Sequence, residues 1–494
     1  MSESDDKHGF LPEIQSGGNA HFLIFAFMLM LMLTIAVLLP LFPNDFWPYV
    51  RIGQEIVANG GIPTNEFMTY SQYGQPAVYL YWLPSVIFLT VFKAGGVTLV
   101  SILSALCVGV FITELWFCLR EVKAGALTSA LVLMLTGLVG VNYWATRPQL
   151  LTYPLFGLAL LLLLRWEKHE ERLIWIFPVL ALLWANLHGS FIVLFFLLGP
   201  ALLFGKGNRK KLLLVTLLSL AATCINRYGI ELWKSMFSMV NSQSIRAFSV
   251  EWEPPTNDGW QANIFFGLLL LIPVLTALLK PRIKLLYWIW FLGFGWMALS
   301  TSRYGVWFLP VEALVLGMIL APFFARHLEG KNRFQNRAFN RLLGVLLLLF
   351  PVMLLPGLRA AWWEQAPSVF SDTTPVEAAA WLKENPQLPD NLWSDFTYST
   401  YLAWELPERK LFMTNRFEDF PPEQFADNKH IANADGDWQA LLDKYRINLL
   451  MPSQENQPDL IEAALASPDW QEVYRDEQAV LFARVEPIST EVQP

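Results

Sequence analysis

The sequence predicts an α-helical polytopic membrane protein of about 11 transmembrane helices, followed by a small C-terminal α/β domain. Three observations lead to this prediction. Hydrophobic residues make up 54% of the 494 residues and charged residues only 16%, a balance typical of chains embedded in a bilayer. Long apolar runs recur as far as residue 358, and beyond it the chain loses them and gains Asp, Glu, Pro and Asn.

The first apolar run, 21–42, follows a tail, 1–20, that contains acidic residues. No small-residue cleavage site follows the run, so we interpret it as a retained first transmembrane helix rather than a cleaved signal peptide. We expect the tail to lie in the cytoplasm.

Ten further runs have about the length that a span requires, roughly 17 to 25 residues. They lie near 97–118, 124–144, 149–165, 173–188, 190–205, 211–226, 262–279, 285–300, 304–323 and 341–358.

Every second connection between these runs is rich in Lys and Arg. The basic connections contain Arg120 and Lys123; Arg165, Lys168 and Arg172; Lys206, Arg209, Lys210 and Lys211; Lys280, Arg282 and Lys284; and Arg326, Lys331, Arg333, Arg337 and Arg341. By the positive-inside rule we expect these connections to be cytoplasmic and the others to face outward.

The apolar segment 78–92 contains 15 residues and would span only about 22 Å as a helix. If it crossed the membrane, all five basic connections would face outward, against the charge rule. We therefore predict an aromatic-rich helix at the outer interface, with Tyr79, Tyr81 and Trp82 at the level of the headgroups.

The segment 359–494 alternates short apolar stretches such as "NLWSDF" and "AVLFARV" with helix-like stretches such as "TPVEAAAWLKEN". This pattern predicts a single α/β domain. Because an odd number of spans precedes it, we expect the domain to be extracytoplasmic.

With this topology, polar residues gather at the outer helix ends and in the first loop, 44–96. They are Asp45, Glu66, Arg147, Asn186, His188, Asn226, Arg227, Glu251, Glu253 and Arg303. Ionisable groups near membrane depth are usually paired or functional, so we predict a polar cleft on this side of the bundle.

The first loop resembles that of GT-C glycosyltransferases, integral-membrane enzymes that use polyprenyl-phosphate-linked sugars. The resemblance rests on an Asp just beyond the first span, on Gly53, Ile56, Gly60, Ile62 and Pro63, on the acidic Glu66, and on Trp82–Leu83. The motifs "RPQLLT", "WANLHG", "NRYG" and "EWEPP" and the segment "KLFMTNRFEDF" further resemble a bacterial GT-C-like group. The resemblance implies a transferase of the plasma (inner) membrane.

Such a transfer requires a carboxylate that takes the acceptor proton and cations that stabilise the phosphate leaving group. We expect Asp45 to be the general base, with Glu66 as a second carboxylate that orients the acceptor. The expected substrate-binding residues are Arg147, Asn186, His188, Asn226, Glu251 and Arg303. Direct displacement would invert the anomeric centre. We expect the acceptor to be a glycan, lipid or protein, and no nucleic-acid partner is expected.

Several alternatives stay open. Asp45 could cap a helix or pair with Arg51, Arg147 could reach lipid phosphates, and the sequence favours structural roles for His188 and Asn226. Asp45 and Glu66 could also hold a divalent cation, although no cofactor is certain. Cys107, Cys118 and Cys224 lie in apolar runs and predict packing, not a metal site. The rival functions are a non-catalytic scaffold that binds a glycan or partner and, with less support, a transporter.

Overall fold

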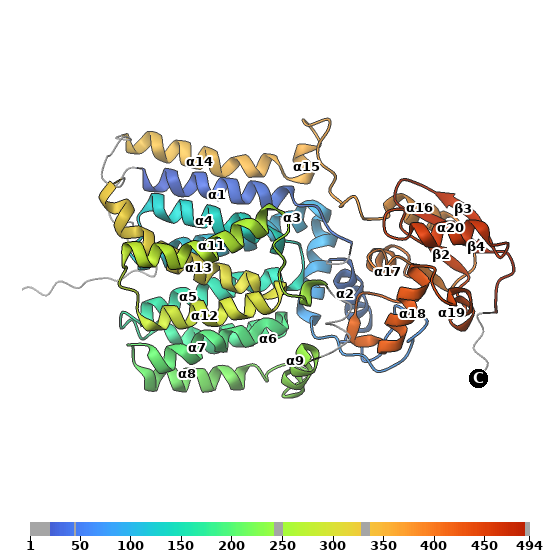
Figure 1. Cartoon of the computed structure of the whole chain (residues 1–494), viewed down its shortest axis with the longest axis horizontal. Coiled ribbons are helices and arrows are strands. Elements are labelled where there is room, and N and C mark those ends of the chain that lie inside the picture. The colour runs from blue at the N-terminus through green and yellow to red at the C-terminus, as the bar shows by residue number, and fades with distance from the viewer. Residues whose placement is uncertain (1–19, 44–45, 242–249, 328–335, 490–494) are drawn as a thin grey trace, which may run out of the picture.

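The computed structural model describes residues 20–43, 46–241, 250–327 and 336–489. Asp45 and most of the predicted tail lie outside these ranges. Figure 1 shows a bundle of helices that lie side by side, with the C-terminal domain at one end of the bundle. We call this end the domain end and the opposite end the basic end.

Every apolar run predicted as a span is helical in the structure. The bundle helices are α1 (His21–Leu38), α3 (Trp82–Glu121), α4 (Ala126–Gly140), α5 (Tyr153–Trp166), α6 (Phe177–Leu187), α7 (Ile192–Phe204), α8 (Arg209–Ala222), α11 (Gly259–Leu279), α12 (Leu285–Ser300), α13 (Gly305–His327) and α14 (Arg337–Met353). Within the described residues, six helical stretches are each long and apolar enough to cross a membrane, and three others are apolar but shorter. The prediction of a polytopic helical membrane protein is confirmed.

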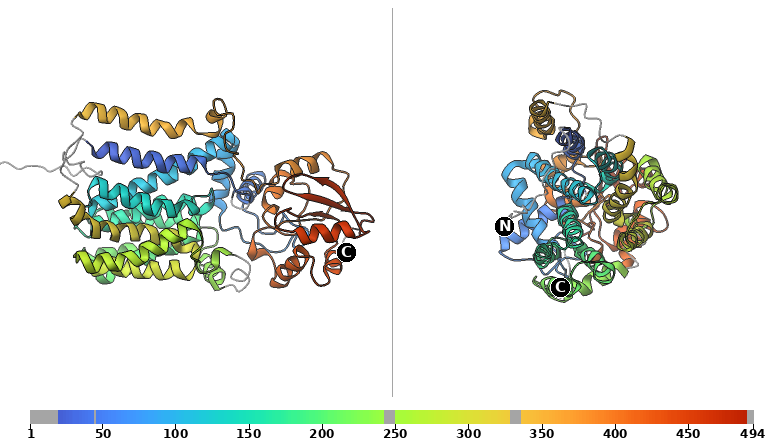
Figure 2. Two further views of the ribbon diagram at one scale, coloured as in Figure 1. Left: turned by 45° about the horizontal axis from the view of Figure 1, so that its top comes forward. Right: turned by 90° about the vertical axis from the view of Figure 1, so that its left-hand side faces the viewer.

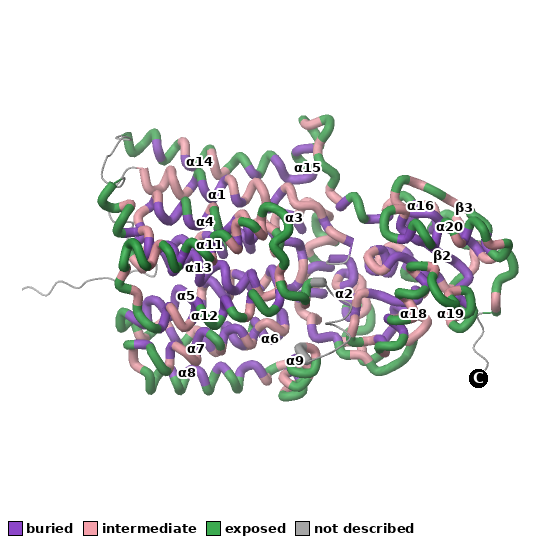
Figure 3. The backbone as a smooth tube through the Cα atoms, viewed as in Figure 1, coloured by how far each residue is buried: buried purple, intermediate pink, exposed green. Residues whose placement is uncertain are grey.

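The outward faces of the peripheral helices are apolar. Figure 3 shows exposed residues along α8, α11 and α14, and many of them are leucines. They include Leu213, Leu214, Leu217 and Leu218 on α8, Leu270, Leu271 and Leu278 on α11, and Leu342, Leu346 and Leu349 on α14. An apolar surface of this extent is unfavourable in water, so these faces contact lipid.

Ion pairs join the connections at the basic end. Glu121 contacts both Arg165 and Lys168, and Glu171 contacts Lys211 at 2.6 Å. The Glu167 carboxylate, which is almost fully buried, contacts Lys284 at 2.7 Å. Four of the predicted basic connections therefore meet at one end of the bundle.

The segment predicted as an interfacial helix is the first part of α3. Gly95 and Gly96 interrupt the helical dihedrals, and Gly96 has φ 56° and ψ −151°, a conformation that essentially only glycine adopts. The part of α3 before this bend lies across the ends of the bundle helices in both side views (Figures 1 and 2). The predicted segment and the following span are thus two helical stretches that meet directly at this kink.

The first loop contains a helix, α2 (Trp47–Asn59), that packs against this part of α3. A Cβ atom on Gly53 would lie only 2.2 Å from the backbone oxygen of Ser85. The close approach of the two helices therefore requires glycine at position 53.

The C-terminal domain is built on a four-stranded sheet of order β1-β2-β4-β3. The strands are β1 (Leu392–Ser394), β2 (Leu449–Met451), β3 (Trp470–Arg475) and β4 (Val480–Arg484), and the helices are α16 (Val376–Glu384), α17 (Ser399–Glu405), α18 (Pro422–Ala432), α19 (Trp438–Lys444) and α20 (Pro458–Ala466). Strands β1 and β2 are parallel, with Leu392 opposite Leu449, and the other pairs are antiparallel.

The first loop and the C-terminal domain share one hydrophobic core, which we call the junction. Leu41 pairs with Phe370, and Thr69 pairs with Leu411, through isolated parallel bridges. The Trp47 ring, which is buried, contacts the Tyr401 ring with 5.2 Å between centroids. The domain is thus fixed to the bundle through the chain that leaves the first helix.

Arg416 joins the two sides of the junction from a buried position. Its guanidinium contacts the Asp419 carboxylate through two nitrogens, at 2.5 and 3.2 Å, and donates to the Val78 carbonyl at 3.0 Å. It also lies 4.2 Å from the centre of the Tyr79 ring.

We expect Arg416→Lys to weaken the junction by about 1–3 kcal/mol, because an ammonium cannot reproduce the forked contact and leaves a buried acceptor without its donor. Limited proteolysis at residues 360–375 should become faster. The control is Arg475→Lys, which alters an exposed pair with Glu472 worth about 0–1 kcal/mol. Equal cleavage rates in the two variants would contradict the role of Arg416.

Candidate functional site

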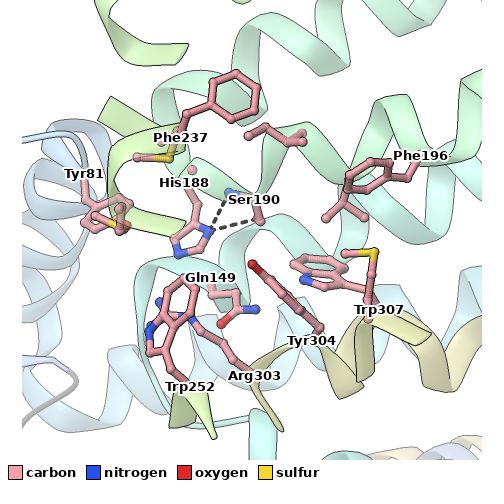
Figure 4. Close-up of a pocket in the computed structure, with 16 residues that line it drawn as sticks. Tyr81, Gln149, His188, Ser190, Phe196, Phe237, Trp252, Arg303, Tyr304 and Trp307 are labelled. Carbon is pink, nitrogen blue, oxygen red and sulfur yellow. Dashed lines mark hydrogen bonds between the residues drawn. The ribbon is translucent and has the colours of Figure 1, made fainter. Parts of the chain in front are cut away.

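A cavity of 280 Å³ lies at the domain end of the bundle, where short 3-10 turns connect the helices. The turns are η2 (Pro148–Thr152), η4 (Gly189–Phe191), η5 (Val250–Trp252) and η6 (Ser302–Tyr304), and α9 (Glu231–Asn241) covers part of the cavity. It is lined by Tyr81, Gln149, His188, Gly189, Ser190, Ile192, Val193, Phe196, Met236, Phe237, Met239, Trp252, Met297, Arg303, Tyr304 and Trp307 (Figure 4).

His188 occupies the polar end of the cavity, directly after α6. Its Nδ1 accepts a hydrogen bond from the backbone N–H of Ser190 at 3.0 Å, which places the ring proton on Nε2. The ring stacks on Tyr81 with 5.0 Å between centroids. Burial, together with the charges of Arg303 and Arg147, holds the pKa of His188 well below its ordinary value. His188 is therefore a neutral hydrogen-bond donor.

Arg303 lies on η6 at the same end of the cavity, and Figure 4 shows it beside Trp252. Its guanidinium lies 5.6 Å from the centre of the Trp252 ring. Gln149 is buried close by, and its Oε1 has no hydrogen-bond partner among the described residues. The polar end thus contains a cation and a buried amide group.

Glu251 connects the two arginines that the sequence singled out. Its carboxylate contacts Arg147 at 2.6 Å and Arg303 at 3.5 Å. Partial removal from water acts to raise the pKa of Glu251, but the two guanidiniums outweigh this effect and hold the pKa below the ordinary value. The carboxylate is therefore charged at neutral pH and orients both arginines.

The remainder of the cavity is apolar and reaches the surface of the bundle. Phe196, Met236, Phe237, Met239 and Met297 form its wall. Phe196 and Phe237 are 46% and 57% exposed. The cavity therefore has a cationic end and an apolar end that opens outward.

The structure brings together four of the predicted residues, which are His188, Arg147, Glu251 and Arg303. Three others, Glu66, Asn186 and Asn226, make contacts that hold the local structure. Glu66 is buried and accepts hydrogen bonds from the backbone N–H groups of Met68 and Thr69. Asn186 bonds the Ile225 carbonyl and accepts from Trp82.

Asn226 accepts from the backbone N–H of Tyr228 and donates to the Thr223 carbonyl. It therefore holds the turn after α8, and none of Glu66, Asn186 and Asn226 lines the cavity. Asp45 lies outside the described residues.

The sequence argument missed Gln149 and Glu418, although both lie in quoted motifs. Glu418, on η7 (Phe417–Asp419), contacts Arg416 at 3.4 Å, and its side chain is a third exposed. Burial raises the pKa of Glu418. The positive charges of Arg416 and, more weakly, of Arg303 act in the opposite direction. Glu418 does not line the cavity, but the charge of Arg303 still acts on it.

No group of three or more His, Cys, Asp or Glu side chains in the described ranges is placed to hold a metal ion.

The fold is similar to that of solved membrane glycosyltransferases. The oligosaccharyltransferase of Archaeoglobus fulgidus, crystallised with a tethered acceptor peptide, superposes with a TM-score of 0.58 at 13% identity, over 95% of this chain and 74% of that one. The mycobacterial arabinofuranosyltransferase AftD gives a TM-score of 0.58 at 13% identity, over 94% of this chain and 41% of that one. The chain has the GT-C fold. No family model matches it, and no curated protein matches its sequence.

Proposed function

We propose that the chain is a membrane glycosyltransferase that moves a sugar from a polyprenyl-phosphate donor to an extracytoplasmic acceptor at the plasma (inner) membrane. The main support for the proposal is that the cavity, within the GT-C fold, has a cationic end and an apolar end. A polyprenyl-phosphate sugar has the same two parts, because a charged phosphate separates its apolar chain from its polar sugar.

Arg303 would hold the phosphate at the cationic end, since a guanidinium matches phosphate oxygens with two parallel N–H groups. The Nε2–H of neutral His188 would donate a further hydrogen bond to it. Arg147 offsets the negative charge of Glu251, so the positive charge of Arg303 stays available to the phosphate. The prenyl chain would follow the wall of Phe196, Phe237 and the methionines and leave through the exposed apolar side.

In the proposed reaction, an oxygen or nitrogen of the acceptor attacks the anomeric carbon while the bond from that carbon to the phosphate oxygen breaks. The leaving polyprenyl phosphate takes the electron pair, and the acceptor proton passes to a carboxylate. A single displacement inverts the anomeric centre.

Asp45 remains our candidate for this carboxylate. It immediately precedes Phe46 and α2, and the Tyr49 ring on the first turn of α2 contacts the Tyr81 ring with 5.9 Å between centroids. Tyr81 in turn lines the cavity. Glu418 is the alternative base among the described residues, whereas the buried contacts of Glu66 favour a structural role.

The test is donor consumption by the purified full chain in lipid nanodiscs. Synthetic polyprenyl-phosphate hexoses and pentoses are supplied with a cell-envelope extract as the source of acceptor, and released polyprenyl phosphate is measured. We expect release from at least one donor, and binding of polyprenyl phosphate in native mass spectrometry. If no donor is consumed and the lipid phosphate does not bind, the proposal is wrong.

A further inference from the structure

Tyr81 lines the polar part of the cavity, directly before α3. The sequence singled it out only as an aromatic residue of the outer interface, and the proposed transfer gives it no role so far. Its ring lies between two others: it stacks on His188 with 5.0 Å between centroids, and it meets the Tyr49 ring edge-on at 5.9 Å. These two contacts hold the ring in one orientation, so a ligand meets it without first ordering it.

The hydroxyl group of Tyr81 is not used by the protein. It makes no hydrogen bond with the described residues. The residue is partly exposed, and its hydroxyl oxygen remains accessible. Partial removal from water raises the pKa of Tyr81, and the charge of Arg303 opposes this effect only in part. The hydroxyl is therefore neutral, and it can both donate and accept a hydrogen bond.

Tyr81 lies on the side of the cavity toward which the donor sugar extends. Figure 4 shows Tyr81 at one side and Phe196 and Trp307 at the other, with His188 between them. In the proposed function the prenyl chain follows the wall that contains Phe196, and the phosphate lies at Arg303. Because the sugar and the prenyl chain are bonded to different oxygens of the phosphate, the sugar extends away from Phe196 and toward Tyr81.

We propose that the Tyr81 hydroxyl hydrogen-bonds a hydroxyl group of the donor sugar, so that Tyr81 is a positioning residue for the anomeric carbon. This inference rests on the proposed function and identifies the cavity residue that contacts the sugar. A site that hydrogen-bonds a substrate hydroxyl rejects analogues that lack this group. Tyr81 therefore selects donors whose sugar keeps the hydroxyl at that position over their deoxy analogues.

The test is the binding of lipid probes to the full chain in nanodiscs, measured by native mass spectrometry. The sugar-bearing probes are polyprenyl-phosphate glucose, mannose and arabinose. The sugar-free probe is polyprenyl methyl phosphate, which has the same chain and the same single charge. The wild type should bind at least one sugar-bearing probe more tightly than the sugar-free probe.

Tyr81→Phe removes the hydroxyl and keeps the ring with its two stacking partners. We expect this variant to bind polyprenyl methyl phosphate like the wild type, and to lose about three- to tenfold in affinity for the preferred sugar-bearing probe. A purely structural role of Tyr81 would instead weaken the binding of both probes by the same factor.

Donors that each lack one sugar hydroxyl identify the partner of Tyr81. For one position of the sugar ring, the deoxy donor should bind the wild type and Tyr81→Phe equally, because the contact is already missing. Deoxy donors that all remain sensitive to Tyr81→Phe would exclude a direct contact with a sugar hydroxyl.

The matched control is Tyr79→Phe, two residues earlier. Tyr79 donates its hydroxyl to the Asn65 carbonyl at 3.2 Å and does not line the cavity, so this variant should keep the wild-type ratio of the two affinities. The proposal is overturned if Tyr81→Phe also keeps that ratio. If the wild type binds neither the sugar-bearing probes nor polyprenyl methyl phosphate, the proposed function fails as well.

Discussion

Asp45→Asn is expected to lower the rate of sugar transfer by about 10² to 10⁴, the usual contribution of a positioned general base. The substitution keeps the shape of the side chain and removes its basicity. Expression and thermal stability should therefore stay close to the wild type. The measurement is the initial rate of polyprenyl phosphate release with a donor that the wild type consumes.

The control for this variant is Glu55→Gln, two turns further along α2. Glu55 pairs with Arg51 at 3.0 Å and lies outside the cavity, so its loss should change the rate little. If Asp45→Asn transfers sugar at the wild-type rate, the base lies elsewhere, and Glu418→Gln becomes the informative variant. If neither substitution slows transfer, a general-base mechanism at this site is excluded.

Arg303→Ala is expected to lower the transfer rate by about 10² to 10³, the loss seen when one donor to a developing negative charge is removed. Arg303→Lys should recover part of the rate, because it keeps the charge and loses the forked geometry. Both variants should also bind polyprenyl phosphate more weakly in native mass spectrometry.

Arg227→Ala serves as the control for charge at the same end of the bundle. Arg227 donates to the Ile62 carbonyl at 2.7 Å and does not line the cavity. We expect this variant to keep most of the activity. Wild-type binding and transfer in Arg303→Ala would refute the proposed phosphate contact.

The sequence predicted the bundle well because a span must be apolar along its whole length, and that property is local. The apolar runs that contain Leu213 and Leu270 each predict a membrane helix without reference to any other part of the chain. The sequence also separated the short segment 78–92 from the span 97–118, and the kink within α3 lies between the two. The angle between the two stretches was not predicted, because it depends on the dihedral angles at Gly95 and Gly96, which composition does not reveal.

The site was predicted only in part, for a related reason. Charge and position at a helix end pointed to Arg303 and His188, which line the cavity. The same criteria selected Glu66, whose buried carboxylate accepts a hydrogen bond from the backbone N–H of Thr69 in the same turn. They missed Gln149, an uncharged side chain, and Glu418, which the fold brings from the far end of the chain. Proximity between distant segments leaves no local signal in one sequence.

The shared core of the first loop and the C-terminal domain has a consequence for biogenesis. Trp47 emerges from the ribosome about 350 residues before Tyr401, the ring that helps to cover it. At a synthesis rate of roughly 5–20 residues per second, Tyr401 follows the aromatic residues of the first loop after on the order of 20 to 70 s. During that time they are exposed at the membrane surface, where a folding factor or the headgroup region must shield them. A chain interrupted before the last quarter of its length would insert its helices and still present this uncovered surface to quality-control proteases.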